Sequence, residues 1–185
     1  MQPNPDIIGG VLVGGHSRRM GRPKALLPHA RAGTFAGHVV AQALHVASEV
    51  YMLGIPPLLP ASLRRLPWIP DSSENSGPLA GLCSLLTIAS DRWALLLACD
   101  LPLLGVSALH QLIAHTGQEV DAVAFANSSR IIGASREALR WHACCALYHP
   151  RILHTVKREL VTGRRSLQQV LRSIRLVTLF SQPEI

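Results

Sequence analysis

Residues 7–27 read IIGGVLVGGHSRRMGRPKALL, an apolar segment of strand character followed by a polar loop rich in glycine and arginine. The strand part ends at Gly14-Gly15, and the loop carries Arg19 and Lys24. A glycine can adopt positive φ and approach a ligand closely because it has no Cβ. Consecutive loop N–H groups can then face a phosphate, while Arg and Lys side chains supply positive charge. The segment predicts a phosphate-binding loop after the first strand of an α/β domain.

The loop carries neither of two common phosphate-binding motifs. The pattern GxxxxGK[ST] fails because Lys24 is followed by Ala25 and Leu26 rather than by Ser or Thr. The dinucleotide pattern GxGxxG is absent as well. An ordinary surface loop with solvated arginines is the alternative interpretation. The complete string, read together with the apolar segment before it, favours a nucleotide site.

Composition predicts a single domain over residues 1–185. A chain of this length can bury a sizeable core, and its 48% hydrophobic content argues against disorder. Aromatic residues are only 4%, and the balance of Leu, Ala, Val and Ile favours a buried parallel sheet flanked by helices. The start MQPNPD lacks a leader pattern, and Asp100 and Pro102 interrupt the run WALLLACDLPLL. We therefore expect a cytoplasmic protein without membrane contact.

Neither the four cysteines nor the nine histidines form a metal-binding pattern. No CxxC or HExxH spacing occurs, and the apolar surroundings of the cysteines predict buried reduced thiols. The cysteines are Cys83, Cys99, Cys144 and Cys145. The net charge of +7 is dispersed along the chain, without an RNA-binding signature or aromatic residues for base stacking. Small anionic substrates explain this charge at least as well as nucleic acid does, and we expect no nucleic-acid partner.

Apolar runs alternate with segments of helical period through most of the sequence. This alternation predicts a mostly parallel sheet with right-handed crossovers. The expected strands are 7–13, 49–55, 93–99, 120–126, 144–148 and 175–180. The expected helices are 34–47, 78–89, 106–116, 150–160 and 166–173.

Ligands of such sheets bind at the carboxyl ends of the strands, and three polar elements fall there. The glycine loop follows the first strand, Asp71 follows the short run 68–70, and Asp100 follows the run WALLLAC. An aspartate at the end of a buried strand needs a partner for its charge. Mg²⁺ bridging phosphate oxygens is a suitable one. The alternatives are ordinary turn or helix-cap roles for both aspartates.

With these residues in view, the chain resembles the molybdenum cofactor guanylyltransferases, within the nucleotidyltransferase superfamily. The matching strings are VLVGGHSRRMGRPKALL, DSSENSGPLAGL and LLLACDLPLL, with a weaker match at CALYHPRIL and VTGRRSLQQVL. They follow the family's order and cover most of the chain. The strings GPLAGL and ACDLP are more similar to the guanylyl-transferring members than to the cytidylyl-transferring relatives.

The resemblance implies a Rossmann-like three-layer α/β/α sandwich of the nucleotide-diphospho-sugar transferase type. It implies transfer of GMP from GTP to molybdopterin with release of pyrophosphate, Mg²⁺ as cofactor, and cofactor-delivery proteins or molybdoenzyme chaperones as partners. Arg19, Lys24 and Asp100 would be catalytic, and Asp100 would also bind the metal. The nucleotide would be bound by Leu12, Val13, Gly14, Gly15, Lys24, Leu53, Asp71 and Asp100.

Three departures from the family pattern stand out. Val13 replaces a usual alanine, and Leu53 or Gly54 stands where an asparagine for the nucleotide is common. The closing NxNTPEEL-like segment is missing, because the chain ends in VTLFSQPEI. That segment lies near the acceptor side of the site in the family. Its loss leaves open another base or acceptor, such as cytidylyl transfer, and a nucleotide-binding protein without catalysis.

The chemistry itself is consistent with the residues present. An acceptor phosphate is already ionised at neutral pH, so no general base is required, and the sequence shows no Ser–His–Asp or paired-carboxylate arrangement. Catalysis would consist of in-line positioning and electrostatic stabilisation of the α-phosphoryl group by Mg²⁺, loop N–H groups, Arg19 and Lys24.

Overall fold

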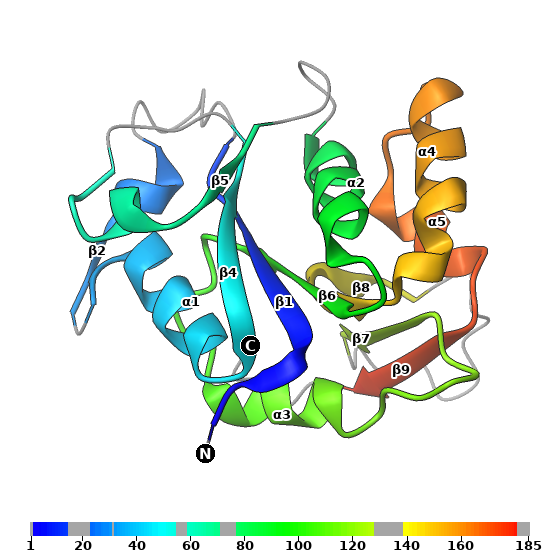
Figure 1. Cartoon of the computed structure of the whole chain (residues 1–185), viewed down its shortest axis with the longest axis horizontal. Helices are drawn as coiled ribbons and strands as arrows, with labels where there is room; N and C mark the ends of the chain where they lie inside the picture. Colours follow the sequence, from blue (N-terminus) through cyan, green and yellow to red (C-terminus); the bar gives the residue numbers. More distant parts are fainter. Residues whose placement is uncertain are drawn as a thin grey trace.

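Figure 1 shows a computed structural model of the chain, in which a sheet runs between two groups of helices. The structure describes residues 2–14, 23–30, 32–54, 59–70, 77–127 and 139–180. Within these ranges seven strands form one sheet, in the order β5-β4-β1-β6-β8-β7-β9, and β2 pairs with β3 separately. The strands are β1 (Asn4–Leu12), β2 (Pro28–His29), β3 (Gly33–Thr34), β4 (Ala47–Leu53), β5 (Trp68–Ile69), β6 (Trp93–Ala98), β7 (Ala122–Ala126), β8 (Trp141–Tyr148) and β9 (Leu176–Phe180).

The directions of the strands confirm the mostly parallel sheet that the sequence predicts. β1 pairs in parallel with β4 and with β6, β4 with β5, and β7 with β9. β8 is antiparallel to both of its neighbours, β6 and β7. All strands of the sheet except β8 therefore end at one edge, which we call the carboxyl edge, and β8 begins there.

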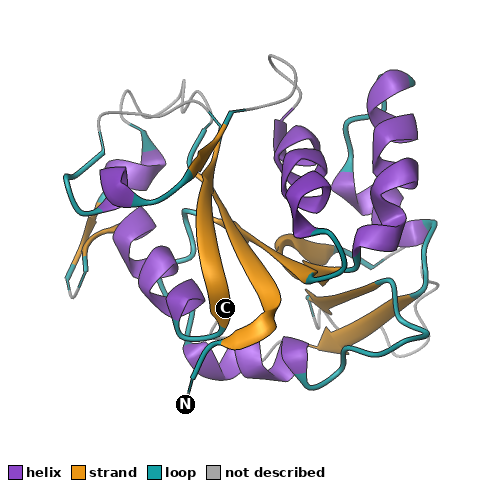
Figure 2. Cartoon of the chain, viewed as in Figure 1, coloured by secondary structure: helices purple, strands orange, loops and turns teal. Residues whose placement is uncertain are grey.

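Helices cover both faces of the sheet, which confirms the expected three-layer α/β/α sandwich (Figure 2). The helices α1 and α3 share one hydrophobic cluster with the sheet, and α2, α4 and α5 share a second. Along β1, Ile7 belongs to the first cluster and Ile8 to the second, so this strand is buried on both faces. The helices are α1 (Phe35–Leu44), α2 (Gly77–Ala89), α3 (Val106–Ile113), α4 (Leu153–Val161) and α5 (Leu167–Arg172), with 3₁₀ turns η1 (Lys24–Leu26), η2 (Leu63–Arg65) and η3 (Pro150–Ile152). In the described ranges, no helix has both the length and the apolar character needed to cross a membrane.

The central strand is packed so closely that one position has no room for a side chain. A Cβ added at Gly10 would lie 2.7 Å from Leu53 Cδ1 and 2.7 Å from Leu85 Cδ2. Leu85 is fully buried and Leu53 is 1% exposed, so neither can move aside into solvent. On the facing helix α2, a Cβ added at Gly81 would lie 2.5 Å from Leu12 Cδ2. Small residues on both elements thus let α2 lie directly on β1.

The differences from the sequence prediction lie in short elements and in element ends. The helix expected over 34–47 ends at Leu44, because β4 already begins at Ala47. The helix expected over 150–160 begins as the 3₁₀ turn η3 before α4. The β2–β3 hairpin was not expected, because strands of two residues show no alternating pattern. Gly33, with φ of 71°, adopts the left-handed conformation that this hairpin requires.

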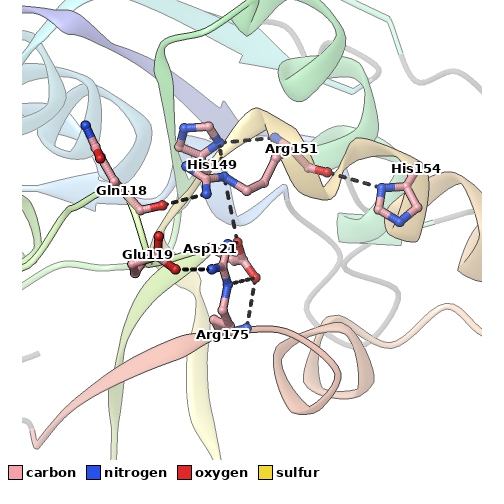
Figure 3. Close-up of polar contacts among 7 residues, drawn as sticks. All are labelled: Gln118, Glu119, Asp121, His149, Arg151, His154 and Arg175. Atoms are coloured by element: carbon pink, nitrogen blue, oxygen red, sulfur yellow. Dashed lines mark hydrogen bonds and ion pairs between the residues drawn. The ribbon is translucent and has the colours of Figure 1, made fainter.

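A cluster of charged side chains lies at the edge opposite to the carboxyl edge (Figure 3). Arg175, just before β9, places Nη2 2.9 Å from Oδ1 of Asp121, just before β7, and donates its main-chain N–H to Oδ2 at 3.0 Å. Arg151 approaches the same carboxylate with Nε at 3.8 Å. Hydrogen bonds from Arg175 outweigh burial and lower the pKa of Asp121. This cluster joins the starts of β7 and β9 to the end of β8. It lies at the opposite edge of the sheet from the carboxyl ends of β1 and β6.

The Gly10 packing predicts a loss of stability in Gly10→Ala. The added methyl group must displace two buried leucines, and we expect the free energy of unfolding to fall by about 1–3 kcal/mol. Gly117→Ala is the matched control, since a Cβ there meets nothing within 4 Å. Urea unfolding of both variants measures the difference. Equal midpoints for the Gly10 and Gly117 variants would contradict the close packing.

The Asp121 cluster predicts a pH dependence of stability. Because the pKa of Asp121 is lowered in the folded state, its contribution is present above the unfolded pKa, about 3.9, and is lost as the pH falls through the lower folded value. Asp121→Asn should therefore cost about 2 kcal/mol at pH 7 and less below about pH 4. Thermal unfolding against pH checks this, with Asp91→Asn in the exposed turn before β6 as control. A cost that does not depend on pH would speak against the ionic contribution.

Candidate active site

The ends of three central strands are held together at the carboxyl edge. The main-chain N–H groups of Val13 and Gly14 donate to the carbonyl of Leu53, at N–O distances of 3.0 and 3.3 Å. On the other side, Cys99 N–H donates to the Leu12 carbonyl at 3.2 Å. The segments that follow β1, β4 and β6 are therefore fixed to one another by main-chain hydrogen bonds, whatever their side chains are. This is where the sequence predicts the nucleotide.

The structure brings Lys24 and Asp100 together at this edge. Lys24 Nζ lies 2.6 Å from Asp100 Oδ2, although the two residues are 76 positions apart. Lys24 opens the 3₁₀ turn η1, and Asp100 follows β6 by two residues. The side chains are 46% and 35% exposed, so ligands can reach both. The hydrogen bond to Asp100, reinforced by its negative charge, raises the pKa of Lys24 and keeps it an ammonium ion at neutral pH.

This pair supplies two chemical groups that can take part in binding a nucleoside triphosphate. An ammonium group can donate to phosphate oxygens, and a carboxylate can hold a hard cation that bridges them. Among the described residues, no three His, Cys, Asp or Glu side chains gather as a metal cage. Mg²⁺ characteristically binds through one or two carboxylates together with substrate phosphates.

Two cysteine thiols lie near the pair and take no part as nucleophiles. Burial, with the charge of Asp100 as a further cause, raises the pKa of Cys99 to about 11 and that of Cys144 to about 11. Both thiols are therefore protonated at neutral pH, and a thiol is far less nucleophilic than a thiolate. All four cysteines of the chain are free, as the sequence predicts.

The other residues predicted for the nucleotide differ in what they can offer. Gly14 is exposed, Leu12 is half-buried and Val13 is buried, so the main chain is what this segment presents. The side chain of Leu53 is 1% exposed and packs in the core, and its carbonyl already accepts two hydrogen bonds. Leu53 thus supports the loop instead of offering a polar side chain. Gly15, Arg19 and Asp71 lie outside the described residues, and their roles stay predictions.

One polar pair at the carboxyl edge was missed by the sequence analysis. Asn127 follows β7, and His142 lies at the start of β8, on the far side of β6 from β1. The His142 Nε2 and Asn127 Oδ1 atoms are 2.6 Å apart, and because an amide oxygen only accepts, Nε2 carries the proton. Burial lowers the pKa of His142, so the ring is neutral at pH 7. Only the direction of β8, which the sequence does not reveal, brings His142 to this edge.

Comparison with known proteins identifies the family. The family model of the MobA-like NTP transferase domain matches residues 9–178, which include the strand ends, Lys24 and Asp100. The chain belongs to the MobA-like NTP transferase family. This MobA-like protein is accordingly a nucleotidyltransferase, and the matched residues include the Lys24–Asp100 pair.

Curated relatives agree with this assignment. The MobA-like chain is 30% identical over 183 residues to a protein of Rhodopirellula baltica described as a "probable molybdenum cofactor guanylyltransferase", covering 91% of this chain and 80% of the relative. A Nostoc protein of the same description is 32% identical over 182 residues, covering 95% and 82%.

Two solved structures share the fold. The Archaeoglobus fulgidus "molybdopterin-guanine dinucleotide biosynthesis protein A" superposes with a TM-score of 0.70 at 18% identity, covering 94% of this chain and 83% of that one. A Mycobacterium tuberculosis H37Rv protein solved in complex with manganese gives 0.61 at 19% identity, covering 96% and 90%. At these identities the structures bear on the fold of the MobA-like chain alone.

Proposed function

We propose that the protein transfers GMP from GTP to molybdopterin and releases pyrophosphate, with Mg²⁺ bound at Asp100. The contact between Lys24 Nζ and Asp100 Oδ2 carries this proposal, because it joins a phosphate-binding cation to a metal-binding carboxylate at the strand ends. The names of the relatives support the guanylyl donor and the pterin acceptor. The partner proteins and the cytoplasmic location expected from the sequence stay predictions.

In the proposed reaction an oxygen of the acceptor phosphate attacks the α-phosphorus of GTP. A bond forms between them, the bond from the α-phosphorus to the bridging oxygen breaks, and pyrophosphate leaves with the electron pair. No proton has to be removed, because the acceptor phosphate is already ionised. Bound Mg²⁺ would neutralise phosphate charge as a Lewis acid.

Lys24 and Asp100 hold each other in place before substrate arrives. Lys24 would then donate to phosphate oxygens as an ammonium ion, the ordinary state of a lysine side chain at neutral pH. Asp100 is the residue that would hold the metal ion through its carboxylate. Charges that are already positioned need little reorganisation, which is the main source of electrostatic catalysis.

We assign recognition of the base to the main chain of Val13 and Gly14. Their N–H groups are engaged by the Leu53 carbonyl, so their carbonyl oxygens are the groups proposed to face the base. A carbonyl accepts hydrogen bonds, and guanine presents donors at N1 and N2. Cytosine offers a single donor, at N4, beside acceptors at N3 and O2, so it would leave one of two adjacent protein carbonyls unpaired.

The metal and phosphate roles are tested by Asp100→Asn and Lys24→Ala. Each should lower kcat/KM for GMP transfer by about 10²–10³, the cost of losing one charged group that stabilises the transition state. The fold should survive, because an exposed ion pair contributes at most about 1 kcal/mol. Pyrophosphate release from GTP with molybdopterin measures the rate, and Lys157→Ala on α4 is the matched control. Wild-type activity of both variants would refute the assignment.

The base assignment is tested by competition binding of GTP and CTP with Mg²⁺. We expect GTP to bind more tightly by about 1–3 kcal/mol for each carbonyl that CTP leaves unpaired. ATP and UTP complete the series. Equal or tighter binding of CTP would overturn the guanylyl assignment and support cytidylyl transfer by the same site.

A further inference from the structure

Two stacked histidines lie beside the Lys24–Asp100 pair. His29 ends β2 and His38 lies in α1, and both are half-buried. Their ring centroids are 4.2 Å apart with an angle of 19° between the planes, so the rings stack face to face. The ring of Phe35 meets the edge of His29 with centroids 6.2 Å apart. We call His29 and His38 the histidine pair.

Both rings reach the turn that leaves Asp100. His29 Nε2 lies 3.2 Å from the carbonyl oxygen of Pro102, and His38 Nε2 lies 2.9 Å from that of Leu104. A carbonyl oxygen accepts only, so each ring donates from Nε2. The Leu104 N–H closes the turn on the Leu101 carbonyl at 3.2 Å. The histidine pair therefore holds one compact turn at two points.

The same two segments of chain carry the charged pair. Lys24 lies five residues before His29, and Asp100 lies two residues before Pro102. The segment 24–29 is itself fastened to α1, because Phe35 N–H donates to the Leu27 carbonyl at 2.9 Å. We propose that His29 and His38 are positioning residues that set Asp100 against Lys24 through the turn 101–104. This inference rests on the proposed function of that pair.

The ion pair by itself would not keep this geometry during the reaction. It is exposed, and exposed ion pairs hold their partners weakly. In the proposed reaction, moreover, Lys24 would bind phosphate and Asp100 would hold the metal, so the two side chains could not rely on each other for their position. The hydrogen bonds from the histidine pair do not involve either charged group, so they persist while the ion pair opens. Together with the apolar packing of Ala25 and Leu104 in one core cluster, they keep the two segments at a fixed separation.

His29→Phe and His38→Phe test the role, because phenylalanine keeps the ring stack and removes the Nε2 donor. His29→Gln and His38→Gln are the rescue variants, since a glutamine amide places a donor near the position of Nε2. His45→Phe, exposed at the end of α1, is the matched control. The circular dichroism spectrum and unfolding temperature of each variant verify the fold. Should a Phe variant not fold, the Asn and Gln variants at the same position are compared instead. The Gln amide reaches the carbonyl oxygen, whereas the shorter Asn side chain does not.

The first readout is independent of catalysis. The chain has only two lysines, Lys24 and Lys157, so low-conversion acylation with acetic anhydride, read by mass spectrometry, reports Lys24 against an internal standard. We expect the ratio of Lys24 to Lys157 acylation to rise about two- to fivefold in the Phe variants, the range for loss of an exposed ion pair. The Gln variants and His45→Phe should keep the wild-type ratio. An unchanged ratio in folded Phe or Asn variants overturns the positioning role.

The second readout is the kinetics of GMP transfer. The Phe variants should lower kcat about tenfold or more with little change in the KM for GTP, since misplacement of a catalytic group affects the transition state most. The Gln variants should recover most of kcat. If wild-type protein transfers no GMP, the proposed function fails, and the acylation ratio still decides whether the histidine pair positions Lys24 and Asp100. A raised KM with unchanged kcat would overturn the proposal.

Discussion

The arrangement of the site depends on the pairing of β1 with a parallel neighbour on each side. The register sets Leu12 beside Leu53 of β4 and beside Ala98 of β6. Three strands thereby end at the same level, and main-chain hydrogen bonds join the residues that follow them. A shift of this register by one residue would turn every side chain of β1 to the other face of the sheet. Burial of Ile7 and Ile8 on opposite faces excludes such a shift.

The architecture could be predicted well because its signals are local. Apolar runs such as WALLLA mark strands buried on both faces, and the strand–helix alternation implies parallel neighbours. The direction of β8 could not be predicted, since a run such as CCALY is equally buried in either direction. The β2–β3 hairpin could not be predicted for a different reason, because strands of two residues are too short to show an alternating pattern.

The sequence predicts candidate members of the site but not their contacts. Lys24 and Asp100 are each assigned from the segment that carries it, since the end of a strand in such a sheet is a binding edge, and their roles stay predictions. Their contact joins two segments 76 positions apart and has no sequence signal. The histidine pair and the His142–Asn127 contact could not be predicted either, because each joins residues from separate segments of the chain. An isolated histidine has no pattern until the fold supplies its neighbour.

The double hydrogen bond to the Leu53 carbonyl has a consequence for how this family can vary. The polar groups at the start of the glycine loop belong to the main chain, so they do not change when side chains are exchanged. At Leu12, Val13 and Leu53 the side chains of this chain pack in the two core clusters. Exchange of these side chains for apolar ones of similar size would therefore leave the main-chain hydrogen bonds in place. The turn after Asp100 differs, because it is held by two imidazoles, and a single codon change in either one removes a contact that no backbone group can replace.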